Sequence, residues 1–116
     1  LREGNAVDDF MRPDRVVVGC NDVRVTVIMK ELYSPFLRTG KPFIVMTPRS
    51  AEMAKYAMNV LLATRIAVMN ELAALAEAQG ADITEVREAL MSDSRIGPTY
   101  LFPGLGYGGS CLVKDV

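Results

Sequence analysis

The chain has 116 residues, half of them hydrophobic, with 13 basic and 14 acidic side chains and a net charge of −1. This balance argues against a nucleic-acid partner or an anionic membrane surface, and the apolar fraction is too high for a disordered chain. Histidine is absent, and the two cysteines have no metal-ligand spacing. We therefore expect a globular protein that binds no metal and works in a reducing, cytoplasmic compartment.

The first third of the chain has the pattern of a strand, a helix and a second strand. Residues 1–13 are charged and irregular, which predicts a loop with one helical turn. A β-branched run over residues 15–20 predicts a buried strand, with Cys20 buried at its end. Amphipathic spacing predicts a helix over 22–34, and residues 42–46 form a second strand. This pattern predicts the closing unit of an α/β domain whose earlier strands lie outside the chain, and we expect the chain to be a piece of a longer protein.

A long helix follows, because no proline or glycine occurs from Ser50 to Gln79 and Gly80 then ends the run. Thr47 can cap its start, and Pro48 suits the first helical position. Its apolar residues cover nearly the whole circumference in the first twenty-odd positions, so a second subunit or further domains should pack on it. Four polar residues interrupt the apolar run, which argues against a membrane span; they are Asn59, Arg65, Asn70 and Glu71.

Lys55 and Asn59 are four residues apart and share one face of this helix. By spacing alone they form either a solvated stripe or a functional pair. A capping box beginning at Asp82 then predicts a short helix through about Met91.

The chain ends in a glycine-rich stretch that carries a cysteine, Gly104-Leu105-Gly106-Tyr107-Gly108-Gly109-Ser110-Cys111. Glycines allow another molecule to approach the main chain closely, so Cys111 is a candidate nucleophile. The stretch also satisfies the dinucleotide fingerprint G-x-G-x-x-G, which would require a strand before it and a helix after it. The third interpretation is an ordinary loop with an inert thiol.

Three motifs in this order, Lys55-Tyr56-Ala57-Met58-Asn59, Arg95-Ile96-Gly97 and the glycine–cysteine stretch, resemble the UDP-glucose/GDP-mannose dehydrogenase family, and within it the bacterial members that act on UDP-glucose. The resemblance covers essentially the whole chain. It implies the end of a Rossmann-type NAD-binding domain over 1–46, a central helical dimerisation region over 47–94, and a sugar-nucleotide and cysteine loop over 95–116. It further implies a homodimer formed through the helix from Ser50 to Gln79.

The resemblance also implies a reaction, the NAD-dependent oxidation of UDP-glucose to UDP-glucuronate in two steps. Cys111 matches the nucleophile, which carries the intermediate as a thiohemiacetal and then as a thioester. Lys55 and Asn59 match the pair that stabilises the oxyanion. Asp115 matches the aspartate that activates water, and Glu3 is a candidate helper in hydrolysis. The glycine fingerprint then becomes a coincidence, and the NAD-binding residues lie mostly outside the chain.

Substrate contacts are implied at seven positions. Arg95 matches an arginine that reaches the neighbouring subunit's sugar nucleotide, and the others match the sugar pocket or the uridine diphosphate loop: Leu1, Tyr100, Leu101, Phe102, Tyr107 and Gly108. For Tyr100 and Phe102 a core role is the open alternative. One departure is Val113, which stands where the family usually has proline.

Two rival functions remain at this point. The first is a sibling enzyme acting on GDP-mannose or a UDP-N-acetylhexosamine. The second is a non-catalytic helical dimerisation module. The chain alone lacks the NAD-binding glycines and a C-terminal domain, so we do not expect it to catalyse by itself.

Overall fold

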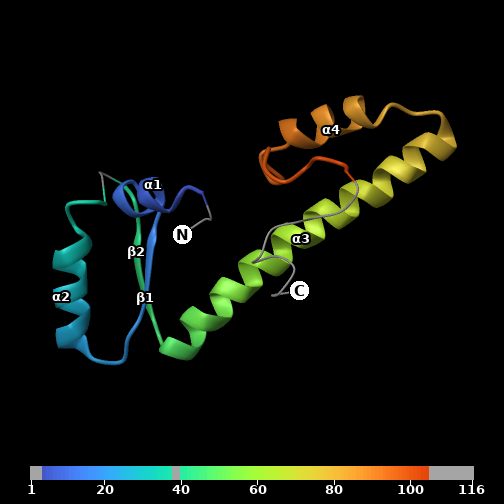
Figure 1. Cartoon of the computed structure of the whole chain (residues 1–116). Helices are drawn as coiled ribbons and strands as arrows, with labels where there is room; N and C mark the ends of the chain where they lie inside the picture. Colours follow the sequence, from blue (N-terminus) through green and yellow to red (C-terminus); the bar gives the residue numbers. More distant parts are fainter. Residues whose placement is uncertain (1–3, 38–39, 105–116) are drawn as a thin grey trace. The chain divides into compact units, whose positions relative to one another are not determined.

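The computed structural model describes residues 4–37 and 40–104. Contacts divide the chain into two compact units, Leu1–Lys55 and Tyr56–Val116, and each is described by itself. The elements in chain order are α1 (Ala6–Met11), β1 (Val16–Gly19), α2 (Val23–Tyr33), β2 (Phe43–Met46), α3 (Pro48–Gln79) and α4 (Ile83–Ser92) (Figure 1).

The first unit is built on two parallel strands joined by a helix. β1 and β2 pair in register from Val16 with Phe43 to Gly19 with Met46, and α2 packs against β1. Parallel neighbours require a crossover connection, which α2 supplies. The predicted strand-helix-strand unit is therefore confirmed, with each strand slightly shorter than expected. The N-terminal segment holds six helical residues in α1, where a single turn was predicted.

The α1 helix is joined to the end of α2 by aromatic contacts. The ring of Phe10 lies 6.1 Å from the ring of Tyr33 and 5.2 Å from that of Phe36, measured between centroids. A hollow of about 390 Å³ lies beside β1, between Phe10, Val17 and Tyr33 among others. None of the predicted site residues that the structure describes lines it.

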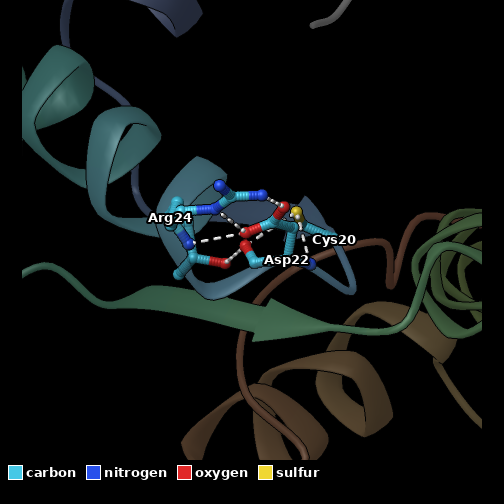
Figure 2. A network of polar contacts seen from close by, with 4 residues as sticks. Cys20, Asp22 and Arg24 are labelled. Atoms are coloured by element: carbon cyan, nitrogen blue, oxygen red, sulfur yellow. Dashed lines mark hydrogen bonds and ion pairs between the residues drawn. The ribbon is translucent and has the colours of Figure 1, made fainter.

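Polar contacts at the start of α2 explain where this helix begins (Figure 2). The Asp22 carboxylate accepts a hydrogen bond from the backbone N–H of Arg24 at 2.8 Å, and the Arg24 guanidinium pairs with the same carboxylate at 3.1 Å. The Cys20 thiol donates to the carbonyl of Asp22 at 3.3 Å and accepts from its N–H. Cys20 is only half-buried, so its predicted burial is wrong; its sulfur takes part in the turn instead.

Gly19 allows the end of β1 to approach the start of α3. A Cβ atom at this position would lie 2.8 Å from both the Cβ of Ala51 and the Cα of Pro48. Real Cβ contacts are essentially never so short, so only glycine fits. The approach holds the first turn of α3 against the strand within the first unit.

The α3 helix has 32 residues and begins at Pro48, the first helical position that the sequence predicts. The Thr47 hydroxyl caps it by accepting from the N–H of Ser50 at 3.2 Å. Gly80, with φ of +69°, ends it, and the N–H of Ala81 bonds the carbonyl of Ala76 at 2.8 Å. This is a Schellman motif, in which the left-handed residue is normally glycine.

The apolar surface of α3 is largely uncovered in the described part of the chain. Leu61, Val68 and Leu75 are each at least half exposed. By length and composition α3 could cross a membrane, with an 18-residue window of mean hydropathy 1.3. The polar interruptions therefore do not exclude a span, contrary to the sequence-based argument. Core helices of soluble proteins pass the same test.

The second unit continues α3 and adds α4 and the segment 93–104. Asp82 caps α4 by accepting from the N–H of Thr84 at 2.7 Å, as the sequence predicts. The buried side chains of this unit are Asn59, Ala63, Met69, Ala76 and Leu101. Leu101 lies beyond α4, so the segment after that helix contributes to the same core.

Candidate functional site

Lys55 and Asn59, the predicted oxyanion pair, both lie in α3 and are four residues apart. Lys55 is exposed. Asn59 is only 8% exposed, and among the described residues it is the one polar residue that is buried. A buried amide is retained where it can hydrogen-bond, which separates Asn59 from an ordinary solvated stripe.

Arg95 follows α4 in a tight turn held by Asp93. Its guanidinium forms an ion pair with the Asp93 carboxylate, with Nη2 at 2.6 Å from Oδ2 and Nε at 3.0 Å from Oδ1. This pairing lowers the pKa of the Asp93 carboxyl and raises that of Arg95. The Arg95 side chain is 86% exposed. Nη1 is not used in this pair, and a guanidinium has five N–H donors, so it can bind a second anion.

Tyr100, Leu101 and Phe102 differ in the direction of their side chains. Leu101 is 5% exposed and belongs to the core, so only its backbone could contact a substrate. Tyr100 and Phe102 are 38% and 62% exposed, so in the described residues neither ring is buried as Leu101 is. Tyr100 also adopts a left-handed φ of +58°, which is uncommon outside glycine and marks an imposed backbone path.

Three side chains from the helices hold the backbone of this segment, and the sequence alone did not assign them a role. Arg65 of α3 donates to the carbonyls of Ile96 at 2.7 Å and Thr99 at 3.1 Å. Arg87 of α4 donates to the carbonyl of Leu101 at 2.8 Å. The Arg87 guanidinium also lies 3.9 Å from the centre of the Phe102 ring.

The third anchor is Asn70 of α3, whose Oδ1 accepts a hydrogen bond from the N–H of Gly104 at 2.7 Å. Arg65 and Asn70 stood in the sequence as interruptions of an apolar helix. The sequence therefore indicated that these two side chains need hydrogen-bond partners, because buried polar groups are normally paired. The identity of those partners, 31 to 34 residues away, could not be read from spacing.

Six of the predicted site residues lie outside the described residues and stay predictions: Leu1, Glu3, Tyr107, Gly108, Cys111 and Asp115. Among the described residues, no group of three or more acidic, cysteine or histidine side chains could hold a metal ion.

Comparison with known proteins identifies both parts of the chain. Residues 49–116 match the model of the UDP-glucose/GDP-mannose dehydrogenase family, central domain, and residues 1–37 match the NAD binding domain of the same family. This match, together with the parallel strand-helix-strand unit, places the chain in the class of dinucleotide-binding α/β proteins. The chain belongs to the UDP-glucose/GDP-mannose dehydrogenase family.

Individual relatives agree with this assignment. The UDP-glucose 6-dehydrogenase of Pseudomonas aeruginosa is 49% identical over 116 residues, which is all of this chain and 26% of that protein. The UDP-glucose 6-dehydrogenase of Haloferax volcanii is 47% identical over 117 residues, covering 99% of this chain and 27% of the relative. The chain therefore spans about a quarter of the length of these relatives.

Solved structures show the same relationship. A UDP-glucose dehydrogenase from Pyrobaculum islandicum superposes with a TM-score of 0.88 at 46% identity, over 99% of this chain and 26% of that chain. A GDP-mannose dehydrogenase from Pseudomonas aeruginosa superposes with a TM-score of 0.72 at 35% identity, over the same shares.

Proposed function

We propose that the full-length protein containing this chain oxidises UDP-glucose to UDP-glucuronate in two steps, with NAD as the hydride acceptor. The observation that carries this proposal is the match of the whole chain to UDP-glucose 6-dehydrogenases at up to 49% identity. The higher identity and TM-score of the UDP-glucose enzyme, compared with the GDP-mannose enzyme, favour UDP-glucose as the substrate.

In this proposal Cys111 makes the double oxidation possible without release of an aldehyde. The first hydride leaves C6 as the hydroxyl becomes an aldehyde, and the thiolate adds to that carbonyl to give a thiohemiacetal. Loss of a second hydride gives a thioester. Water then attacks the thioester carbonyl, releasing the carboxylate and the free thiol, with Asp115 activating the water and Glu3 assisting.

Lys55 and Asn59 stabilise the negative oxygen that develops in these steps. An ammonium and an amide N–H are suitable donors for an oxyanion, and their spacing places them on one face of α3. The burial of Asn59 supports this role, because a donor shielded from water acts more strongly on a developing charge.

The nucleotide part of the substrate is bound by the loop 95–108 in this proposal. The exposed rings of Tyr100 and Phe102 offer stacking surfaces, and Leu101 offers only its backbone. Leu1, Tyr107 and Gly108 complete the sugar and diphosphate contacts. Arg95 reaches the substrate of a neighbouring subunit with the guanidinium nitrogen that Asp93 leaves free.

The turn after β1 does not fit the pyrophosphate of NAD. The Asp22 carboxylate already accepts from the N–H of Arg24 at the start of α2, so a phosphate would meet a negative charge. Gly19, before this turn, is closely covered by Ala51 and Pro48. We therefore assign no pyrophosphate contact to this turn.

We further propose that α3 forms a homodimer in the cytoplasm. Leu61, Val68 and Leu75 recur every seven residues and are 65%, 50% and 57% exposed, which is the spacing of a helix-packing seam. A second copy would cover this stripe and explain an apolar helix without a membrane. The thiol chemistry of Cys111 and the free thiol of Cys20 suit a reducing compartment.

The test is turnover of the full-length protein. With UDP-glucose we expect two NADH per UDP-glucuronate formed, and Cys111→Ala should abolish formation of the acid. Cys20→Ala is the matched control, because its thiol lies in the turn before α2, and it should stay active. Undiminished acid formation by Cys111→Ala would refute the mechanism.

Two further measurements distinguish UDP-glucose oxidation from the two alternative functions, a sibling dehydrogenase and a non-catalytic dimerisation module. Faster NADH formation with GDP-mannose or a UDP-N-acetylhexosamine would replace the substrate proposal by a sibling activity. Sedimentation with and without UDP-glucose tests the non-catalytic module, which predicts a dimer that does not bind the nucleotide sugar. Val68→Glu should shift the dimer toward monomer, because it places a charge in the apolar seam.

A further inference from the structure

We propose that Asn70 and Arg65 are positioning residues, which hold the backbone of residues 96–104 on α3 so that the chain enters the cysteine loop from a fixed point. This inference rests on the proposed function, because it concerns the loop that carries Cys111. Neither side chain needs to touch substrate or cofactor for this role.

The segment needs such anchors because its backbone lies outside helices and strands. Residues 97–104 include Pro98 and Pro103, which cannot donate a backbone hydrogen bond, and no strand pairs with them in the described structure. Backbone groups outside regular structure bond either to side chains or to water, and only a side chain fixes their position. Side chains of the two helices take four of these groups, on Ile96, Thr99, Leu101 and Gly104.

Arg65 holds both sides of the turn. Its two terminal nitrogens donate separately to the carbonyls of Ile96 and Thr99, on either side of Gly97, which has φ of +74°, and Pro98. The planar guanidinium suits two carbonyls at once. A lysine has a single ammonium on a flexible stem and would replace only part of this arrangement.

Asn70 holds the C-terminal end of the segment 96–104. Its Oδ1 lies 2.7 Å from the backbone nitrogen of Gly104, and Asn70 is five residues beyond Arg65 along α3. Gly104 is seven residues before Cys111, so an extended chain places the cysteine within about 25 Å of this anchor. A Cβ atom on Gly104 would meet nothing within 4 Å, so the bond is not a by-product of tight packing there.

These anchors should favour substrate binding, because they order the loop before the nucleotide sugar binds. A loop that is already held at Ile96, Thr99 and Gly104 loses less conformational freedom when a nucleotide sugar binds. Releasing one anchor therefore raises the KM for UDP-glucose more than it lowers kcat. It also increases the exposure of the backbone amide that the anchor protected.

The decisive experiment compares Asn70→Ala, Asn70→Asp and Gln79→Ala in the full-length enzyme. Asn70→Ala removes the acceptor, and loss of one hydrogen bond predicts about a fivefold rise in KM with a smaller change in kcat. Asn70→Asp keeps an acceptor oxygen and should restore most of the affinity. Gln79→Ala removes an exposed amide from the end of the same helix and should behave as the wild type.

Hydrogen–deuterium exchange of the peptide that covers residues 101–104 gives a readout independent of turnover. We expect faster exchange in Asn70→Ala than in the wild type or Asn70→Asp. Arg65→Met should accelerate exchange over 96–100 and raise KM by about tenfold, with Arg65→Lys between it and the wild type. If Arg65→Met does not fold, the Asn70 series alone decides.

The outcomes separate this inference from the proposed function. Unchanged KM and exchange in Asn70→Ala, or equal loss in Asn70→Asp and Asn70→Ala, would overturn it. If the wild type reduces NAD with none of the nucleotide sugars, the proposed function fails. Faster exchange in Asn70→Ala alone would then still uphold the anchor.

Discussion

The strand-helix-strand unit and the segment 93–104 satisfy their backbone groups in opposite ways. In the first, β1 and β2 bond each other along a parallel ladder, extended at its ends by Val16 to Pro42 and Cys20 to Met46. In the second, Arg65, Asn70 and Arg87 replace a ladder with side-chain bonds. Regular structure makes a rigid scaffold from the backbone alone. A loop that must present its backbone to a ligand requires side chains from elsewhere.

The largest effect should come from the scaffold. Gly19→Val would place side-chain atoms against Pro48 and Ala51 where even a Cβ is too close. We expect a loss of about 3 kcal/mol in the free energy of unfolding, measured by urea denaturation of the full-length protein. Gly104→Ala is the control, because a Cβ there meets nothing within 4 Å, and it should change stability by less than about 0.5 kcal/mol. Equal effects at both positions would contradict the close approach.

The loop anchor should come next. Arg65→Met removes two hydrogen bonds from a charged donor and leaves the carbonyls of Ile96 and Thr99 without it. We expect a loss of about 2 kcal/mol in stability, together with faster proteolysis after residue 95. Stability loss without loosening of this segment would show that Arg65 supports α3 rather than the loop.

Arg87 should have a smaller effect. Arg87→Lys keeps the charge but loses the fixed fork between the Leu101 carbonyl and the Phe102 ring. We expect about 1 kcal/mol, measured as a shift of the unfolding midpoint. Glu88→Gln, the next residue along α4, is the comparison, and it should leave the midpoint unchanged.

The smallest effect is a pH dependence at the start of α2. The pKa of the Asp22 carboxyl is lowered, first by the hydrogen bond from the Arg24 side chain. A carboxyl with a folded pKa below its unfolded value, about 3.9, stabilises the protein above that pH and loses its contribution as the pH falls. Asp22→Asn keeps a cap acceptor but does not titrate, so its stability should fall less between pH 5 and pH 3. Parallel pH curves would exclude Asp22 as a contributor.

Several local features were predictable from the sequence because their causes are local. A β-branched run predicted β1, a short apolar run predicted β2, and amphipathic spacing predicted α2. Thr47, Gly80 and Asp82 marked the ends of α3 and α4. Three motifs in order, around Lys55 and Asn59, at Arg95 and in the glycine–cysteine stretch, together indicated the family that the comparisons show. The hydrophobicity of α3 indicated that something must cover it, but not what covers it.

The sequence by itself determined the element order, the helix caps and the family, because each depends on residues within a few positions or on motifs in a fixed order. Tertiary structure alone decided that Leu101 belongs to the core while Phe102 faces outward, and that Cys20 joins a turn. It also decided that Arg65 and Asn70 serve a segment more than thirty residues away. The reason is physical: a hydrogen-bond donor in a sequence shows that a partner is needed, and only the folded chain selects the partner.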